Sequence, residues 1–331
     1  MESKSNKSSE ITLAFTGDVM LGRLMNDVME QKGTAYVWGD LIADLKNSDL
    51  TLINSEFAIT NSKNEWDAWS KTFHFKMLPK FRETLKHAGV DYASLANNHI
   101  LDFKERGLLD TIKILDKLKI KHTGAGQNLR KAKKPAIFNI KKIKIGVLSF
   151  QDNHKDWTAT KDKPGTFYLE INKEGLEIIK REIKKLRPKV DILIVSAHWG
   201  PNMLEYPLKE HTDFAHSLID EGIDIFHGHS SHVFQGIEKY KNKLIMYDTG
   251  EFIDDYAVDS FLRNDLSFLY LIKLNKRKLK ELELIPVIIK NFQVNKAESE
   301  ADMINYMMTK RSLLFKTKFV EKNKSLILKF N

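Results

Sequence analysis

The sequence predicts an α/β fold that finishes in an antiparallel region. Over residues 11–227, short apolar and β-branched runs alternate with segments whose apolar residues recur at helical spacing. That alternation is typical of strands joined by crossover helices that pack on a sheet. After His232 the pattern changes to runs separated by short turns such as 241–243, which favour hairpins. With 331 residues, 42% of them hydrophobic, the chain can bury a large core.

The predicted elements follow one another along the chain. Strands are expected at 11–16, 49–54, 92–96, 144–150, 190–196 and 223–227, and helices at 21–31, 79–88, 107–118 and 208–221. The helix at 107–118 rests on a one-faced apolar spacing, and Pro79 suits a first helical turn. Later strands are expected at 233–238, 244–247, 266–274 and 280–290, followed by a helix at 299–311.

Three segments are predicted without regular structure or with open alternatives. Residues 61–71 and 152–166 are expected to be long loops over the rim of the sheet, and such loops often carry binding functions. The C-terminal end alternates Lys with Phe and Leu, which fits an added strand, an amphipathic attachment or a frayed tail. We therefore expect a main domain at 11–290 and a C-terminal helix with a basic tail at 291–331.

Charge and cysteine content restrict the classes of function. The formal charge is +9, but residues 310–331 hold seven Lys or Arg against one Glu, so this tail carries +6 and the rest of the chain only +3. A nearly neutral body makes a nucleic-acid partner unlikely. Cysteine is absent, so any metal must be held by His, carboxylate, amide or water.

Hydropathy gives an expectation about location. Residues 1–10 are polar and lack the apolar stretch of a signal peptide. No uninterrupted apolar run approaches the roughly 18 to 20 residues that a membrane span needs. We therefore expect a cytoplasmic protein without a transmembrane segment.

Polar clusters follow the apolar runs at five places. They are Thr16-Gly17-Asp18, Asn54-Ser55-Glu56, Ala96-Asn97-Asn98-His99, Ala197-His198-Trp199-Gly200 and Gly228-His229-Ser230-Ser231-His232. Strands that deliver such residues at their ends indicate a shared polar site along one rim of a sheet. Nitrogen and oxygen ligands gathered there are what divalent metals require.

The first cluster is ambiguous when taken alone. Asp18 follows Gly17 and is equally well explained as a turn residue. Arg23 could reach an anionic group from the first turns of the next helix, although a surface arginine is the simpler explanation. Asp18 gains weight only from the other clusters.

The cluster around His99 favours chemistry. The Asn98 amide oxygen can ligate a metal, the His99 imidazole can ligate or act as a general acid, and Asp102 can orient the ring. The alternative is capping of a helix by Asn97 or Asn98. The run is too polar for a simple buried turn.

The remaining histidines differ in how specific they are. His198 alone is more often a structural residue, although the following Gly200 permits close approach of a ligand. His229 and His232, in a Gly/Ser turn, favour metal or phosphate binding, and His227 is expected to be structural. The carboxylates between 248 and 255 would repel one another, so they either contact substrate or form a solvated acidic loop.

Taken in order, these residues resemble the CapA family of capsule and poly-γ-glutamate synthesis proteins, whose domain looks like a calcineurin-type metallophosphoesterase. The matching stretches are 16–23, 54–56, 95–99 with Asp102, 198–200 with 205–206, 228–235 and 247–252. The resemblance spans roughly 11–256. It implies a four-layer αββα sandwich, with a metal site at the carboxyl ends of the strands.

The resemblance also implies roles for individual residues. The ligands to one or two divalent ions, Mn, Fe, Zn or Mg, would be Asp18, Glu56, Asn98, His198, His229 and His232. The catalytic residues would be His99, as the acid that protonates a leaving oxygen, and Asp102. The substrate-binding residues would be Arg23, Asn54, Asn97, Trp199 and Glu251. Glu56 would bridge two ions that clamp an in-line displacement at phosphorus.

This chain departs from the family patterns at four points. Val19 and Met20 stand where the phosphoesterase motif Asp-x-His has its histidine, and the second histidine of Gly-His-x-His comes one residue late, at His232. Glu251 replaces the Asn of a common Gly-Asn-Phe stretch, and residues 1–10 lead us to expect no N-terminal anchor of the kind frequent in the family. The expected function is a divalent-metal-dependent hydrolase of a phosphoester-like bond. The alternative is a non-catalytic accessory protein that binds an anionic polymer such as poly-γ-glutamate.

Overall fold

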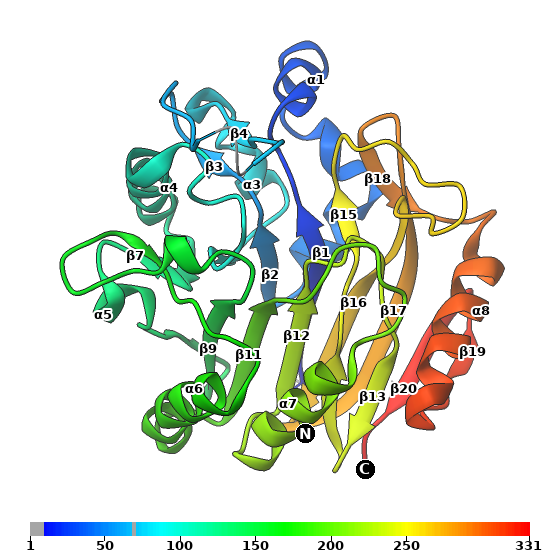
Figure 1. The fold of residues 1–331 in the computed structure, drawn as a ribbon. Helices are drawn as coiled ribbons and strands as arrows, with labels where there is room; N and C mark the ends of the chain where they lie inside the picture. Colours follow the sequence, from blue (N-terminus) through cyan, green and yellow to red (C-terminus); the bar gives the residue numbers. More distant parts are fainter. Residues whose placement is uncertain (1–9, 68–70) are drawn as a thin grey trace, which may run out of the picture.

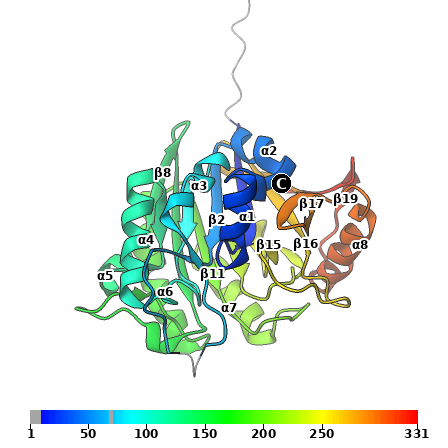
Figure 2. The ribbon, with the colours of Figure 1, turned by 90° about the horizontal axis from the view of Figure 1, so that it is seen from above.

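Two β-sheets pack face to face and helices cover their outer surfaces (Figures 1 and 2). The computed structural model describes residues 10–67 and 71–331. The helices are α1 (Leu24–Lys32), α2 (Ile42–Asn47), α3 (Thr84–His87), α4 (Lys104–Leu118), α5 (Leu129–Ala132), α6 (Lys173–Leu186), α7 (Lys209–Asp220) and α8 (Ala301–Ser312). Short 3-10 turns are η1 (Tyr36–Leu41), η2 (Pro79–Phe81), η3 (Lys155–Trp157), η4 (Arg187–Lys189) and η5 (Leu313–Phe315).

The first sheet is the larger and contains the N-terminal strand. Its order is β19 (Val320–Lys322), β20 (Ser325–Lys329), β17 (Lys278–Lys290), β16 (Leu266–Asn275), β1 (Glu10–Val19), β2 (Leu50–Ser55), β5 (Tyr92–Ser94) and β6 (Lys121–Thr123). Off this path, β15 (Glu251–Ile253) pairs with β1, and β18 (Gln293–Lys296) pairs with β17. The strands β1, β2, β5 and β6 are parallel, whereas β16 runs antiparallel to β1.

The second sheet lies across the core from the first. Its order is β13 (Ile237–Tyr240), β14 (Lys243–Met246), β12 (Ile225–His229), β11 (Ile192–His198), β9 (Ile143–Gln151) and β8 (Ala136–Ile140). Two small ladders complete the fold: β3 (Ala58–Ile59) with β4 (Lys76–Met77), and β7 (Ala125–Gly126) with β10 (Gly165–Thr166).

Three apolar cores define the layers. One, with Trp38 and Leu115, lies between the first sheet and the helices α1 to α4. A second, with Phe15 and Ile194, lies between the two sheets. The third, with Ile183 and Phe214, lies between the second sheet and the helices α6 and α7. A sheet with both faces buried must be apolar on both sides, so the predicted order of layers, αββα, is confirmed.

Several predicted elements differ in extent or placement. The helix expected at 79–88 is a 3-10 turn followed by the single turn α3. The helix α6 was not predicted, although Ile179, Ile183 and Leu186 are buried at helical spacing and the Asn172 side chain accepts a hydrogen bond from the Gly175 amide. The side-chain cap and the spacing are ordinary helix signals.

The antiparallel finish is divided between the two sheets. The strand β14 lies parallel to β12 in the second sheet, and β13 folds back on β14. The chain then returns to the first sheet through β15, and β16 pairs with β1. The expected hairpins therefore form, β13 with β14 and β16 with β17, but they lie in different sheets. The apolar pattern marks a strand but not the sheet that it joins.

The C-terminal segment completes the first sheet. The strand β20 pairs with β17 and β19 pairs with β20, so the end of the chain is an added strand rather than a frayed tail. The strand β18 also pairs with β17, and the sheet therefore continues across residue 290, where the predicted division lay. Among the helices of the described residues, none combines the length and apolarity that a bilayer crossing requires.

Candidate metal centre

The polar clusters meet at the edge where parallel strands of both sheets end. Figure 1 shows β1, β2, β11 and β12 running in the same direction. In the ladders, Asp18 is opposite Asn54, and His198 is opposite His229. The backbone therefore brings these side chains to one rim, as the sequence predicts.

A close backbone crossing brings the loop before β15 onto β1. A Cβ atom at Gly17 would lie 1.9 Å from the carbonyl oxygen of Gly250, and the Asp18 amide donates to that same oxygen. Only glycine fits at position 17 without displacing the crossing chain. The crossing places Glu251 opposite Asp18 in a parallel ladder.

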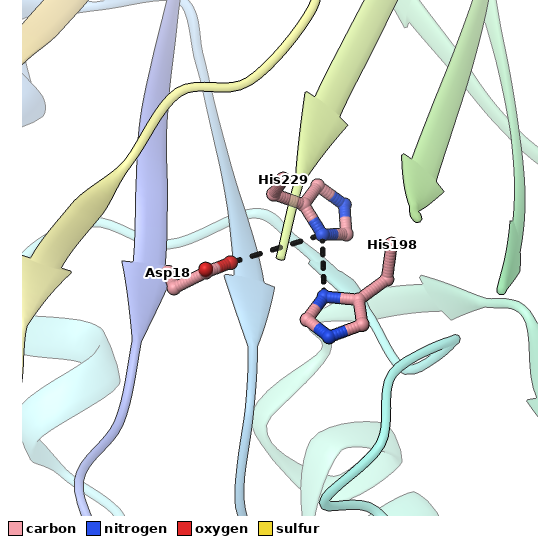
Figure 3. A group of neighbouring side chains, drawn as sticks. All are labelled: Asp18, His198 and His229. Atoms are coloured by element: carbon pink, nitrogen blue, oxygen red, sulfur yellow. Dashed lines mark hydrogen bonds and ion pairs between the residues drawn. The ribbon is translucent and has the colours of Figure 1, made fainter. Parts of the chain in front are cut away.

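Two groups of side chains could each hold a metal ion. One is Asp18, His198 and His229, and the other is Asp18, Glu56 and His232; in each group the potential ligand atoms lie within 4.8 Å of one another. Figure 3 shows the first group, with both imidazoles and the carboxylate turned toward one point. Asp18 is common to both groups.

A chain of hydrogen bonds fixes which nitrogen of His229 faces the site. His227 Nε2 lies 3.0 Å from the Thr16 carbonyl oxygen, which can only accept, so His227 Nδ1 is left to accept from Ser196 Oγ. Ser196 Oγ then accepts from His229 Nε2 at 2.9 Å. The His229 Nδ1 lone pair therefore faces Asp18, whose Oδ1 is 3.8 Å away.

The neighbouring His198 also presents a lone pair. Its Nε2 donates to the Asn98 amide oxygen at 3.1 Å, so the lone pair of the neutral ring is on Nδ1, which lies 3.3 Å from Asn54 Nδ2. Burial lowers the pKa of His198 to about 3 and holds that of His229 well below its usual range. His198 Nδ1 and His229 Nδ1 are only 2.9 Å apart. Two acceptor nitrogens at that distance, beside a carboxylate, fit a cation.

The buried carboxylates Glu56 and Asp18 also indicate a site for a cation. Burial, and then the charge of Asp18, raise the pKa of Glu56 well above its usual value. Burial alone would also raise the pKa of Asp18, but the hydrogen bond from His232, together with the neighbouring imidazoles of His198 and His229, outweighs it and keeps that pKa low. Glu56 Oε1 is buried without a hydrogen-bond partner. A divalent ion would satisfy that oxygen, and an O/N donor set without thiolate suits Mn, Fe, Zn or Mg.

His232 lies at the second group and joins it to Glu251. Its Nδ1 is 3.5 Å from Asp18 Oδ2 and forms an ion pair with Glu251 Oε1. Burial would lower the pKa of His232, but the charge of Glu251 and a hydrogen bond to Asp18 raise it well above its usual value. Its backbone has φ 63°, the left-handed region, in the turn that aims the ring at Asp18.

His99, the candidate acid, lies beside the two ligand groups, and Asp102 contacts its other ring nitrogen. His99 Nδ1 is 2.7 Å from Asp102 Oδ2, and its Nε2 is 3.8 Å from Glu56 Oε1. Lys71 Nζ lies 3.2 Å from Asp102 Oδ1 and also donates to the Asn98 carbonyl oxygen. Burial raises the pKa of Asp102 to about 7, and burial together with Lys71 lowers that of His99.

Four of the five predicted substrate-binding residues lie within this network or at its rim, and Glu251 is the one that pairs with His232. Asn54 donates to Asp18 and Glu56, and Asn97 donates to Asn54. Arg23 lies at the rim, where its Nε is 3.3 Å from Asp255 and its guanidinium lies over the Phe75 ring.

The structure places Trp199 elsewhere. Its indole donates to the Tyr247 carbonyl oxygen and packs against Phe226 and His211 in the core below α7. The expectation that Trp199 binds substrate is therefore corrected, because its ring is buried in the core below α7. Trp199 directly follows His198, the last residue of β11, and successive residues of an extended chain point to opposite faces.

Two residues of the site were not predicted. Lys71 belongs to the loop at 61–71, which was expected over the rim without a named residue, and part of that loop, 68–70, lies outside the described residues. Ser196 lies inside a strand and carries no signal of its own; only its register beside His227 reveals its place.

Comparison with known proteins agrees with this geometry. A family model described as "Bacterial capsule synthesis protein PGA_cap" matches residues 12–256, which include every candidate metal ligand. The chain belongs to this family. The capsule-synthesis resemblance predicted from the polar clusters is therefore confirmed.

Relatives within the capsule-synthesis family cover most of the chain. The protein is 31% identical over 257 residues to the capsule biosynthesis protein CapA of Bacillus anthracis, with 76% of this chain and 62% of that protein covered. It is 30% identical over 333 residues to a probable polyglutamine synthesis accessory protein of Mycobacterium tuberculosis, with 87% of each covered. The chain thus spans less than two thirds of the length of the Bacillus anthracis relative.

Solved structures show a more distant similarity. The sulfate thiohydrolase SoxB of Thermus thermophilus is 11% identical with a TM-score of 0.49, and the match covers 94% of this chain and 61% of that one.

Proposed function

We propose that this member of the capsule-synthesis family is a divalent-metal-dependent hydrolase that cleaves a phosphoester-like bond in an anionic substrate. The observation that carries the proposal is the pair of facing acceptor nitrogens, His198 Nδ1 and His229 Nδ1, 2.9 Å apart beside Asp18. Imidazoles kept neutral by burial, next to an ionised carboxylate, form a site prepared for a cation.

A bound divalent ion would polarise a phosphoryl oxygen and lower the pKa of a water molecule. The ligands would be Asp18, His198 and His229 on one side and Asp18, Glu56 and His232 on the other. Because Asp18 belongs to both groups, it would contribute a carboxylate oxygen to an ion held by either one. The bridging role of Glu56, and ligation by the Asn98 amide oxygen, stay predictions.

His99 would donate a proton to the leaving oxygen. Asp102 holds the ring through Nδ1, so Nε2 faces the site. In the free protein the lowered pKa of His99 keeps the ring neutral. An anionic ester beside Nε2 would raise that pKa, so that substrate binding brings in the proton which the leaving oxygen needs. Arg23, 30% exposed at the rim, would attract the anionic group.

The test is metal analysis together with hydrolysis of an activated aryl phosphodiester. Purified protein should contain stoichiometric divalent metal, and turnover in Mn-containing buffer should disappear with a chelator and return when Mn is restored. His229→Asn should lose both metal and turnover. As a matched control, His216→Asn removes a histidine outside the site, on α7, whose Nε2 contacts Glu238. Metal-free protein without turnover under any divalent ion would reject the proposal.

One observation favours the non-catalytic alternative, an accessory protein that binds an anionic polymer. The position of the missing motif histidine is Met20, which is fully buried in the apolar core and offers no ligand to a hard ion. Salt-sensitive binding of poly-γ-glutamate by protein that carries no metal would support that alternative.

A further inference from the structure

The outer face of the C-terminal helix exposes the large apolar side chains of Met303 and Tyr306 beside the charged Asp302 and Lys310. The inner face of α8 buries Ile304 and Met308. Yet Tyr306 is 67% exposed on the same helix, and Leu313 and Leu314, in the turn η5 that continues it, are 58% and 62% exposed. Large apolar side chains gathered on an exposed surface are typical of an interaction site.

The exposed side chains form one stripe. Met303, Tyr306, Lys310 and Leu313 follow the i, i+3, i+7, i+10 spacing that places residues on one face of a helix. Figures 1 and 2 both show α8 and β19 at the outer edge of the molecule. No described residue packs over this stripe, whose side chains remain exposed in the folded chain.

Lysines surround the stripe. Lys310, Lys316, Lys318 and Lys322 are exposed, and none of them forms an ion pair with a described residue. A groove of about 360 Å³ adjoins the stripe: Lys239, Lys316, Lys318 and Lys329 line it, together with the apolar side chains of Phe315, Val320, Ile327 and Leu328. The face therefore combines an apolar surface with unpaired positive charge.

We propose that this face, formed by α8, η5 and β19, docks onto the surface of an anionic lipid bilayer. Exposed leucines and tyrosine would enter the boundary between headgroups and acyl chains, while the lysines contact anionic headgroups. The inference is independent of the metal centre, because none of the candidate ligands lies in this segment.

The positive charge of this face favours an anionic bilayer over the other possible partners. A second copy meeting the face through a two-fold axis would bring the same lysines against one another, and residues 310–331 hold seven basic residues and one acidic residue. The charged residues Glu321 and Lys322 on the edge strand β19 also oppose pairing with another strand. A dissolved polyanion would use the lysines but would leave the leucines exposed.

The inner face explains how the stripe is held rigid. Arg311 is buried, and its guanidinium donates to the Phe234 carbonyl oxygen and to Glu205. The Ser312 hydroxyl accepts from the Ile237 amide at 2.9 Å. These contacts fix α8 on the second sheet, so substitutions on the outer face should leave the fold intact.

The experiment is flotation of the full chain with phosphatidylcholine vesicles that contain or lack phosphatidylglycerol, at low and high salt. Binding is expected only with phosphatidylglycerol. The double change Leu313→Ser, Leu314→Ser and the double change Lys316→Gln, Lys318→Gln should each weaken it at least about tenfold, because both terms contribute to interfacial binding. Metal content and thermal midpoint should not change.

Matched controls lie away from this face. Phe261→Ser removes a 91% exposed aromatic side chain from the loop after β15, and Lys184→Gln, Lys185→Gln removes two lysines from the outer side of α6; neither should alter flotation. Failure of the wild-type chain to float, or salt-sensitive flotation that survives the leucine changes, would overturn the proposal. A concentration-dependent dimer that the leucine changes abolish, without vesicle binding, would also overturn it.

Discussion

The two sheets supply different chemistry to one site. The first sheet and its loops bring oxygen donors, Asp18, Glu56 and Asn98, whereas the second brings the nitrogen donors His198, His229 and His232. Burial keeps His198 and His229 neutral, whereas burial and the charge of Asp18 raise the pKa of Glu56. The difference teaches that packing of the two sheets brings oxygen and nitrogen donors together, in a donor set that suits a divalent cation.

The largest effect on metal binding and hydrolysis is expected when the first sheet loses Asp18, the carboxylate that both ligand groups share. Asp18→Asn should abolish stoichiometric metal binding and lower hydrolysis by more than the roughly 10- to 100-fold that loss of a group behind a ligand costs. Elemental analysis and turnover measure it. Asp91→Asn is the control, since this carboxylate accepts from the Thr51 amide at the opposite end of β5. Retained metal in Asp18→Asn would show that the sheets do not share a cation.

The next effect separates proton transfer from metal binding. His99→Asn should lower kcat by about 100- to 10,000-fold, the usual contribution of a general acid or base, while metal content stays stoichiometric. Asp102→Asn should lower kcat in the same direction, because the ring loses its orienting carboxylate. If His99→Asn instead releases the metal, His99 is a ligand and not the acid.

A smaller effect tests the hydrogen-bond chain inside the second sheet. Ser196→Ala should weaken metal affinity by about 10- to 100-fold, since the group behind a ligand fixes its tautomer. The matched control is Ser149→Ala, whose serine pairs with Ser196 in the ladder and bonds instead to Thr123. Titration with a competing metal indicator compares the three proteins; equal affinities would contradict the tautomer argument.

The smallest effect is a pH dependence of the metal-free protein. Burial lowers the pKa of His227 from 6.5 to about 4. Between these pH values the unfolded chain therefore binds a proton at His227 that the folded chain does not bind. The free energy of unfolding is therefore unaffected by this group above pH 6.5 and decreases as the pH falls toward 4. The decrease is about 3 kcal/mol, at 1.36 kcal/mol per pKa unit. Denaturant midpoints of chelator-treated protein should fall over that window, and His227→Gln should flatten the fall. An unchanged slope in the variant would exclude His227 as the cause.

Much of the site was predictable because its residues follow strands. Asp18, His99, His198 and His229 were identified from polar residues that end apolar runs, and the structure brings all four to one rim. Trp199 has the same position in the sequence pattern, yet it faces the core below α7. One residue of register decides the face of a strand side chain, and the pattern at the end of β11 does not reveal it.

Ser196 and Lys71 could not be predicted for a different reason. Both act through partners that are distant in the sequence: Ser196 contacts His229, and Lys71 contacts Asp102. A hydroxyl inside a strand and a lysine in a polar loop are ordinary residues until the partner is placed beside them.

By itself the sequence determined the family, the alternation of strands and helices, the αββα layers that the family implies, and the chemical types that line the rim. The tertiary structure decided which strands entered which sheet, which carboxylate both ligand groups share, and which nitrogen each histidine presents. The physical reason is that periodicity and residue type are local properties, whereas charge compensation, tautomer and burial depend on neighbours that only folding brings together.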